Sequence, residues 1–300
     1  MDLFRELTAV SGEQNVLRNE PMSRHTTFRI GGPADYFVTP TDKEEIKKII
    51  KFCREAQIPF YVIGNGSNLL VGDRGYRGVI IQIFKQMSKI DVDGEQIAAQ
   101  AGALLSKVAS AALDASLTGF EFASGIPGTL GGALRMNAGA YGGEMKQVVR
   151  SADVLTPDGE IITLTVDELG MGYRTSVISK NDYVVIDAIL QLKKGNQEEI
   201  QAQMADLRER RVSKQPLEYG SAGSTFKRPE GYFAGKLIDD AGLRGFRVGD
   251  AQVSEKHCGF VINRGNATAA EVLELMRIVT ERVEEKFGVR LQPEVRCIGE

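Results

Sequence analysis

The chain has 300 residues, of which 42% are hydrophobic and 26% charged, and its formal net charge at pH 7 is −3. This length predicts two or three domains, since a single hydrophobic core stops growing near this size. The slightly acidic balance argues against a nucleic-acid surface, and no apolar run approaches the roughly 18 residues of a membrane span. Three dispersed cysteines and two dispersed histidines argue against a disulfide framework and a His-based metal site, and favour a reducing cytoplasm.

The first predicted unit covers residues 1–83. A short helix is expected near the start, and residues 26–40 alternate like two strands about a Gly-Gly-Pro turn. Thr41 and Glu44 are interpreted as a capping box, because apolar residues recur at helical spacing directly after them. The remaining segments are read as strand, glycine turn and strand, at residues 60–63, 64–71 and 78–83.

A first glycine loop, GNGSNLLV, follows the strand expected at 60–63. Leu69 stands where a dinucleotide fingerprint has its third glycine and no helix pattern follows, so a Rossmann fold is excluded. The loop also lacks the GxxxxGK[ST] pattern of a P-loop, and taken alone it is equally consistent with a simple turn. Since glycine lets a ligand approach the backbone, its candidate ligand contacts are Gly64, Asn65, Gly66, Ser67, Asn68 and Leu69.

The second predicted unit covers residues 84–200. Its expected elements are a hairpin at 89–101, a helix at 106–117, a second hairpin at 149–166, a strand at 182–192 and the start of a helix at 196–214. The LRERRVSK run within that last helix is interpreted as a solvated surface rather than a nucleic-acid patch.

The densest glycine region of the chain runs from Phe120 to Gly143, with seven glycines in 24 residues. Thr129 is a candidate N-cap for a short helix, and the unpaired N–H groups of a helix start suit a phosphate. We interpret the region as a backbone cradle for an anionic ligand; the alternative is a tight glycine corner between strands. With the first loop it suggests two cradles that hold one elongated ligand with two phosphates. Its candidate contacts are Ser124, Gly125, Ile126, Pro127, Gly128, Gly131, Gly132, Asn137 and Gly139.

The third predicted unit covers residues 201–300. Strands are expected around 251–254 and 259–263, followed by a long helix that begins with a capping box of Thr268 and Glu271. We expect this unit to be a separate α/β domain.

Two glycine loops on a non-Rossmann scaffold resemble the FAD-binding region of the vanillyl-alcohol oxidase (PCMH) type. The chain contains the following motifs in this order: TTFRIGG, GNGSNLLV, GIPGTLGGALRMNAGAYG, GYRTS, AGSTFKRP, AGKLID and LQPEVR. Together they resemble the UDP-N-acetylenolpyruvoylglucosamine reductase family over nearly the whole chain. The implied fold is α+β, with a two-part FAD-binding region and a separate α/β substrate-binding domain. The short stretch between Arg174 and Lys194 resembles the form of the family without an inserted tyrosine-bearing loop.

The resemblance implies an enzyme that reduces UDP-N-acetylglucosamine enolpyruvate to UDP-N-acetylmuramate in cytoplasmic peptidoglycan synthesis. It implies non-covalent FAD as cofactor, NADPH as co-substrate, a monomeric state, and no metal, nucleic acid or membrane partner. Its catalytic residues match Arg174, Ser224 and Glu294. Candidate contacts to the UDP-sugar are Tyr173, Lys227, Arg228, Arg244 and His257.

Taken from the residues alone, these roles are less specific. Arg174 offers a planar fork that fits a carboxylate, but it is also consistent with a surface cation. Ser224 is not a hydrolase nucleophile, because AGSTF is not GxSxG, and Glu294 is also consistent with a strand end in water. Two other functions stay open: another flavin-dependent oxidase of the same superfamily acting on a sugar or lactone, and a non-catalytic protein that binds a nucleotide sugar or a flavin.

Overall fold

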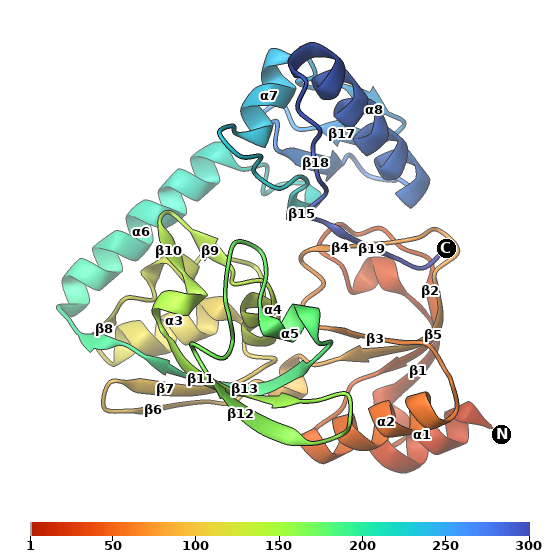
Figure 1. Cartoon of the computed structure of the whole chain (residues 1–300), viewed down its shortest axis with the longest axis vertical. Helices are drawn as coiled ribbons and strands as arrows, with labels where there is room; N and C mark the ends of the chain where they lie inside the picture. The colour runs from red at the N-terminus through yellow and green to blue at the C-terminus, as the bar shows by residue number, and fades with distance from the viewer. Residues whose placement is uncertain (1) are drawn as a thin grey trace. The chain divides into compact units, whose positions relative to one another are not determined.

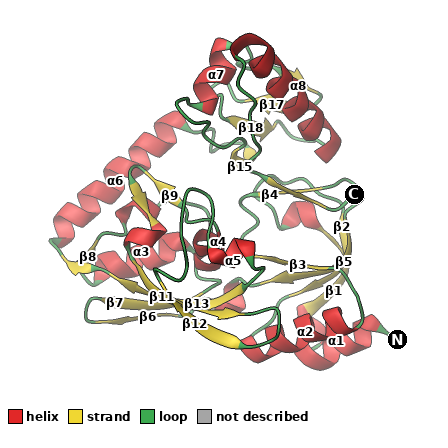
Figure 2. Ribbon diagram, viewed as in Figure 1, coloured by secondary structure: helices red, strands yellow, loops and turns green. Residues whose placement is uncertain are grey.

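The structure is a computed structural model and describes residues 2–300. The chain forms two compact units, each assembled from three stretches. Unit 1 consists of the residues up to Leu17, Tyr36–Asn65 and Val79–Arg211, and unit 2 consists of Arg18–Asp35, Gly66–Gly78 and Val212–Glu300. Both units contain helices and strands (Figure 2), so the α+β class is confirmed. The three-part division at residues 83 and 200 stays a prediction.

The first sheet has four strands in the order β1-β2-β5-β3. These strands are β1 (Val16–Pro21), β2 (Pro33–Val38), β5 (Tyr76–Gln82) and β3 (Phe60–Ile63), and β3 runs parallel to β5. Strands β1, β2 and β5 each have residues in both units. Two helices of unit 1 contact each other, α1 (Leu3–Ser11) and α2 (Lys43–Glu55). The N-cap of α2 is Asp42, whose carboxylate accepts from the Glu45 backbone, so the capping box expected at Thr41 and Glu44 is displaced by one residue.

The second sheet lies wholly in unit 1 and has five antiparallel strands in the order β12-β11-β13-β7-β6 (Figure 1). Its strands are β6 (Ile90–Asp93), β7 (Gln96–Gln100), β11 (Val149–Leu155), β12 (Ile161–Thr165) and β13 (Val184–Gln191). The helices of this region are α3 (Leu105–Asp114), α4 (Leu130–Arg135), α5 (Val177–Lys180) and α6 (Gln197–Lys214). Two short strand pairs also form here: β8 (Leu117–Thr118) pairs with β14 (Lys193–Lys194), and β9 (Gly139–Ala140) pairs with β10 (Gly143–Glu144). Helix α4 contacts β13 and β7, which fixes the glycine-rich segment on this sheet.

Unit 2 contains a four-stranded antiparallel sheet in the order β15-β18-β17-β16. Its strands are β15 (Gly220–Ser224), β16 (Arg247–Val248), β17 (Ala251–Val253) and β18 (Phe260–Asn263). Helix α8 (Ala269–Phe287) packs on β16 and β17, and α7 (Ala234–Asp240) packs on α8. The capping box expected at Thr268 and Glu271 is confirmed.

Segments far apart in the sequence complete unit 2. Strand β4 (Leu69–Val71) pairs in parallel with β19 (Arg296–Ile298). The carboxylate of Asp73 accepts from the Ala269 and Ala270 backbones at 2.7 and 2.9 Å, which caps the start of α8 from 196 residues away. The strand expected over 26–30 is wrong, because the Thr26 hydroxyl donates to the Ile30 carbonyl and the chain turns there.

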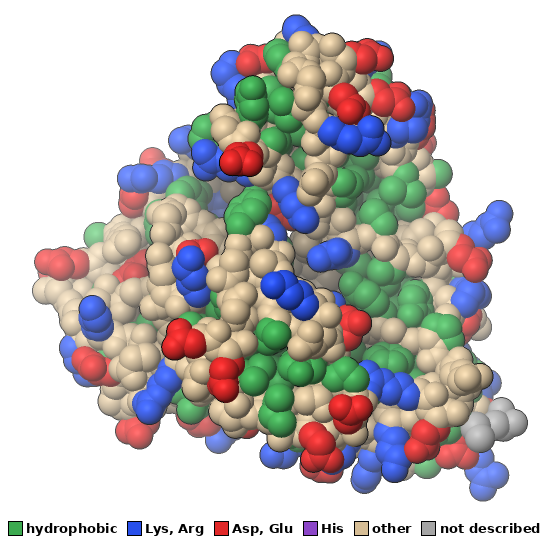
Figure 3. Space-filling model, in the orientation of Figure 1, with side chains coloured by type: hydrophobic (Ala, Val, Ile, Leu, Met, Phe, Trp, Pro, Cys, Tyr) green, Lys and Arg blue, Asp and Glu red, His purple; other side chains and the backbone are tan. Residues whose placement is uncertain are grey.

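Side chains of both charges are interspersed over most of the surface that Figure 3 shows. Among residues 2–300 no helix has both the length and the apolar character needed to cross a membrane. In the same part of the chain, no group of three or more His, Cys, Asp or Glu side chains is arranged to hold a metal ion.

Candidate functional site

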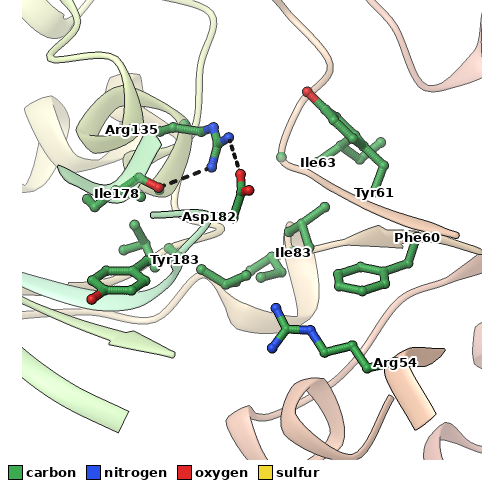
Figure 4. A pocket seen from close by; sticks show the side chains of 16 residues that line it. Arg54, Phe60, Tyr61, Ile63, Ile83, Arg135, Ile178, Asp182 and Tyr183 are labelled. Carbon is green, nitrogen blue, oxygen red and sulfur yellow. Dashed lines mark hydrogen bonds and ion pairs between the residues drawn. The ribbon is translucent and has the colours of Figure 1, made fainter. Parts of the chain in front are cut away.

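A pocket of about 380 Å³ opens in unit 1, within the range typical of ligand sites. Most of its lining is apolar and comes from β3, from the end of β5 and from β13, with glycines of both loops between them: Gly64, Gly131 and Gly132. Figure 4 shows two arginines at its edge. Arg54 lies beside Phe60, and Arg135 is directed toward the Ile178 carbonyl and Asp182, each at 3.4 Å. The pocket therefore combines an apolar interior, bare backbone and cations at the edge.

The two glycine loops meet within unit 1, as a shared cradle requires. The side-chain amide of Asn65 donates to the Pro127 carbonyl at 2.6 Å. Gly64 lies against Thr129, and a Cβ at Gly64 would stand 2.1 Å from the Thr129 hydroxyl oxygen. Thr129 is buried and is the N-cap of α4, although its side chain makes no capping hydrogen bond. The first loop therefore needs glycine at 64 to fit against the second.

The adjacent glycines at 131 and 132 have different surroundings. A Cβ at Gly131 would stand 3.0 Å from the Cβ of Ala101, so this glycine lets α4 pack closely on the end of β7. A Cβ at Gly132 would meet only the Thr129 hydroxyl oxygen, at 3.6 Å, and Gly132 lines the pocket. The fold leaves room for a side chain at Gly132, so the bare backbone there fits a bound group such as a cofactor.

Other residues predicted to contact a cofactor have structural partners. The Ser124 hydroxyl donates to the Glu121 carbonyl, and Gly139 allows β9 to approach Gly143. Asn137 is buried in a left-handed conformation, with φ of 45°. Its amide donates to Glu144 and to the Gly172 carbonyl, and its side-chain oxygen accepts from the Lys146 backbone. The side chain of Asn137 therefore shapes the loop, and its contact with a cofactor stays a prediction.

Residues 66–69 belong to unit 2. Gly66 has φ of 62° and packs on the His25 carbonyl, so it is needed for local packing. Leu69 begins β4, and Ser67 lies partly exposed between them. The Asn68 amide donates to the Glu294 carbonyl at 3.2 Å, which joins this loop to a predicted catalytic segment.

Arg211, at the end of unit 1, is a cation that the sequence reading assigned to a solvated helix surface. It is only partly exposed, and its side chain lies against Gly125, where a Cβ would stand 3.1 Å from Arg211 Cδ. Burial lowers the pKa of its guanidinium, and among residues 2–300 it makes no hydrogen bond or ion pair. A half-buried arginine stays charged, so this position suits an anionic group next to the loop. The contact of Arg211 with Gly125 identifies this arginine as a candidate site residue. Sequence periodicity does not show such a contact.

Arg174 occupies a turn in unit 1 with φ of 54°, a left-handed conformation that is costly for a residue with a Cβ. The turn is closed by paired hydrogen bonds between Gly172 and Thr175, and the guanidinium carbon lies 5.2 Å from the ring of Tyr173. Tyr173 is more than half exposed, at 55%. The closed turn therefore holds the backbone of Arg174 in one defined conformation.

Ser224 ends β15 in unit 2, directly after Gly223 with φ of 75° and an irregularity in the pairing with β18. Its neighbour Thr225 is buried, and the Thr225 hydroxyl accepts from the Val261 backbone at 2.9 Å. No hydrogen bond to the Ser224 hydroxyl occurs within residues 2–300, so this hydroxyl is available to donate to a ligand.

Glu294 lies beside Ser224, because the Glu294 backbone donates to the Thr225 carbonyl at 2.8 Å. Phe226 and Pro293 form the next bridge, and Lys227 donates from its backbone to Gln292. The structure therefore brings together Ser224 and Glu294 within unit 2, and Arg174 belongs to unit 1.

The cations predicted to bind the substrate differ in how they are engaged. Arg244 forms a two-pronged ion pair with Asp239 at 2.9 and 2.6 Å and also donates to the Glu255 carbonyl. Burial lowers the pKa of His257, whose Nδ1 accepts from the Gly259 backbone at 3.1 Å, so a proton on the neutral ring would be at Nε2. Lys227 is partly exposed, and Arg228 is exposed.

Comparisons with known proteins cover nearly the whole chain. Residues 34–165 match the family described as FAD binding domain, and residues 215–298 match the family described as UDP-N-acetylenolpyruvoylglucosamine reductase, C-terminal domain. The chain is 56% identical to the UDP-N-acetylenolpyruvoylglucosamine reductase of Agathobacter rectalis, over 99% of this chain and 98% of that protein.

Solved structures extend the comparison to the fold. The crystal structure of UDP-N-acetylenolpyruvylglucosamine reductase from Thermus caldophilus is similar with a TM-score of 0.80 and 38% identity, over 94% of this chain and 97% of that one. A structure of alkyldihydroxyacetonephosphate synthase is similar with a TM-score of 0.50 and 17% identity, over 65% of this chain and 41% of that one. The second likeness concerns the fold alone.

Proposed function

Since this chain belongs to the UDP-N-acetylenolpyruvoylglucosamine reductase family, we propose that it reduces UDP-N-acetylglucosamine enolpyruvate to UDP-N-acetylmuramate with FAD and NADPH. The identity of 56% over almost the whole length carries this proposal. Relatives at this identity have the reductase name, so neither the oxidase nor the non-catalytic binding protein is retained.

The residues of unit 1 fit FAD. The pocket offers an apolar lining for a flat ring system, and Gly132 offers bare backbone for a diphosphate. Arg211 beside Gly125 supplies a cation for an anionic part of the cofactor. Bound FAD supplies hydride transfer, from NADPH to C3 of the enolpyruvyl ether. Because neither loop contains a cysteine or histidine for attachment, FAD is held non-covalently, and acid precipitation of the yellow protein leaves the flavin in the supernatant.

Arg174 binds the substrate carboxylate and neutralises the negative charge that develops when C3 accepts hydride. A guanidinium presents two parallel donors to a carboxylate, and a donor fixed before the reaction stabilises developing charge most effectively. The closed turn from Gly172 to Thr175 provides that fixation.

Ser224 donates the proton that C2 receives. Its hydroxyl has no hydrogen-bond partner within residues 2–300, and a carbanion-like C2 is basic enough to take a proton from it. Glu294 lies on the neighbouring segment and assists this proton transfer or the polarisation of the enol. The product belongs to peptidoglycan synthesis, and we place the enzyme in the cytoplasm as a monomer.

Oxidation of NADPH by the purified protein tests this function. Loss of absorbance at the NADPH band should require the enolpyruvyl UDP-sugar, with one UDP-N-acetylmuramate formed for each NADPH consumed. Loss of NADPH at the same rate without the sugar, with oxygen as acceptor, would instead indicate an oxidase.

A further inference from the structure

The loop after Ser224 presents aromatic side chains at the surface of unit 2. Phe233 is 61% exposed, more than any other large hydrophobic side chain in residues 2–300, and its neighbour Tyr232 is 47% exposed. Apolar side chains are normally stabilised by burial, and this protein leaves the Phe233 ring in water. The other exposed hydrophobic side chains of unit 2, such as Leu217 and Leu273, are aliphatic and lie on different segments.

The ring of Phe233 is held in place by Arg228. The guanidinium carbon of Arg228 lies 3.9 Å from the ring centroid, which places the cation directly over the ring. Nε of Arg228 donates to the Tyr232 carbonyl at 3.2 Å, and the Tyr232 backbone donates to the Pro229 carbonyl at 3.1 Å. Gly231, with φ of 74°, permits this turn. The cation and the ring therefore form a prearranged flat surface.

This surface is connected directly to the predicted catalytic segment. Arg228 follows Ser224 by four residues, and the intervening Phe226 is buried while the Lys227 backbone donates to Gln292. The segment between them is therefore rigid. A substrate whose enolpyruvyl group reaches Ser224 would have the rest of its length available to this turn.

From this arrangement we infer that Phe233, together with Arg228, stacks on the uracil base of the UDP-sugar. The inference rests on the proposed function and names the base subsite of the same substrate. The flat base can stack on the aromatic ring of Phe233, because stacking requires a π-face. The guanidinium of Arg228 beside that ring also attracts the phosphates attached to the base. Arg228 then acts through Phe233 and the base, rather than on the diphosphate alone.

The test compares UDP with inorganic pyrophosphate as ligands of the FAD-loaded enzyme. Base–aromatic stacking of about 1–3 kcal/mol corresponds to about 5- to 150-fold in affinity. Phe233→Leu, which keeps the bulk but removes the π-face, should weaken UDP binding by this factor and leave pyrophosphate binding unchanged. Phe233→Tyr should restore UDP binding. A matched control is Phe246→Leu, since Phe246 also lies under an arginine, Arg282 at 4.6 Å, but is on another segment.

Fluorescence offers a direct reading, because the sequence contains no tryptophan. In Phe233→Trp the single indole should be quenched when UDP binds, and in Phe246→Trp it should not. Unchanged UDP affinity in Phe233→Leu, equal weakening of pyrophosphate, or an unquenched indole in Phe233→Trp would overturn the inference. So would a loss in the rate of flavin reduction by NADPH equal to the loss of UDP affinity, since the surface would then serve the dinucleotide.

Turnover by the parent enzyme separates the two proposals. If the parent oxidises NADPH with the enolpyruvyl sugar while Phe233→Leu binds UDP normally, the function stands and the stacking inference fails. If the parent does not turn over but UDP quenches the indole of Phe233→Trp, the stacking inference stands and the proposed function fails.

Discussion

Replacing Gly132 with alanine distinguishes a glycine that the fold needs from one that a ligand needs. In the cofactor-free protein the added methyl group would meet only the Thr129 hydroxyl oxygen, at an ordinary contact distance of 3.6 Å. Alanine is favoured over glycine within a helix by roughly 0.5–1 kcal/mol, so Gly132→Ala should make the cofactor-free protein slightly more stable. With FAD in the pocket the same methyl would enter occupied space, which costs about 1–3 kcal/mol, or about 5- to 150-fold in FAD affinity.

Two measurements on the same variant test this reasoning. Urea unfolding of the cofactor-free protein gives the stability change, and flavin fluorescence titration gives the dissociation constant of FAD. Gly131→Ala is the matched control, because its methyl would meet the Cβ of Ala101 at 3.0 Å and should destabilise the protein before any cofactor binds. A Gly132→Ala protein that is more stable and binds FAD as tightly as the parent would refute a cofactor at this backbone.

Three further predictions concern catalysis and pH. Arg174→Lys keeps the charge but loses the two parallel donors of the guanidinium, so turnover should fall by about 10²–10³. Flavin reduction by NADPH, followed by stopped flow, should be little changed. Equal losses in both half-reactions would make Arg174 structural. Ser224→Ala should slow reoxidation of the flavin by the enolpyruvyl substrate by about 10²–10⁴ and Ser224→Cys should recover part of it, whereas reoxidation at the parent rate would assign the proton to another group. Burial and the facing Asp153 raise the pKa of Asp187, with Lys43 opposing. The unfolding free energy should therefore decline as pH rises from the ordinary carboxyl pKa through the raised one, and Asp187→Asn should abolish this decline in urea titrations at several pH values.

Local sequence patterns predicted most of the regular elements. The hairpins at β6–β7 and β11–β12, strand β13 and helix α6 lie where alternation or helical spacing placed them. These signals are local, because each depends on neighbours a few residues away. The strand expected over residues 26–30 was wrong for the opposite reason: Phe28 and Ile30 alternate because they fill the core of unit 2, not because they pair in a sheet.

The sequence likewise predicted some residues of the candidate site and missed others. The glycine loops and the three predicted catalytic residues were identified from motifs, and the structure adds that Ser224 and Glu294 lie on adjacent segments. Arg211 and Phe233 were missed, since only a contact with Gly125 distinguishes the first and only exposure distinguishes the second. Burial and exposure of single side chains depend on partners distant in sequence, and periodicity does not report them.

The assembly of each unit from three stretches has a consequence for synthesis on the ribosome. Thr27 donates to Ser221, 194 residues later, and Phe28 accepts from Asn263, 235 residues later. At 5–20 residues per second the partners of these early residues emerge roughly 10–40 s after them. During that interval the apolar side chains of residues 18–35 and 66–78 have no core to enter. The nascent chain is therefore expected to depend on a chaperone that covers these two stretches until the last third of the protein has been made.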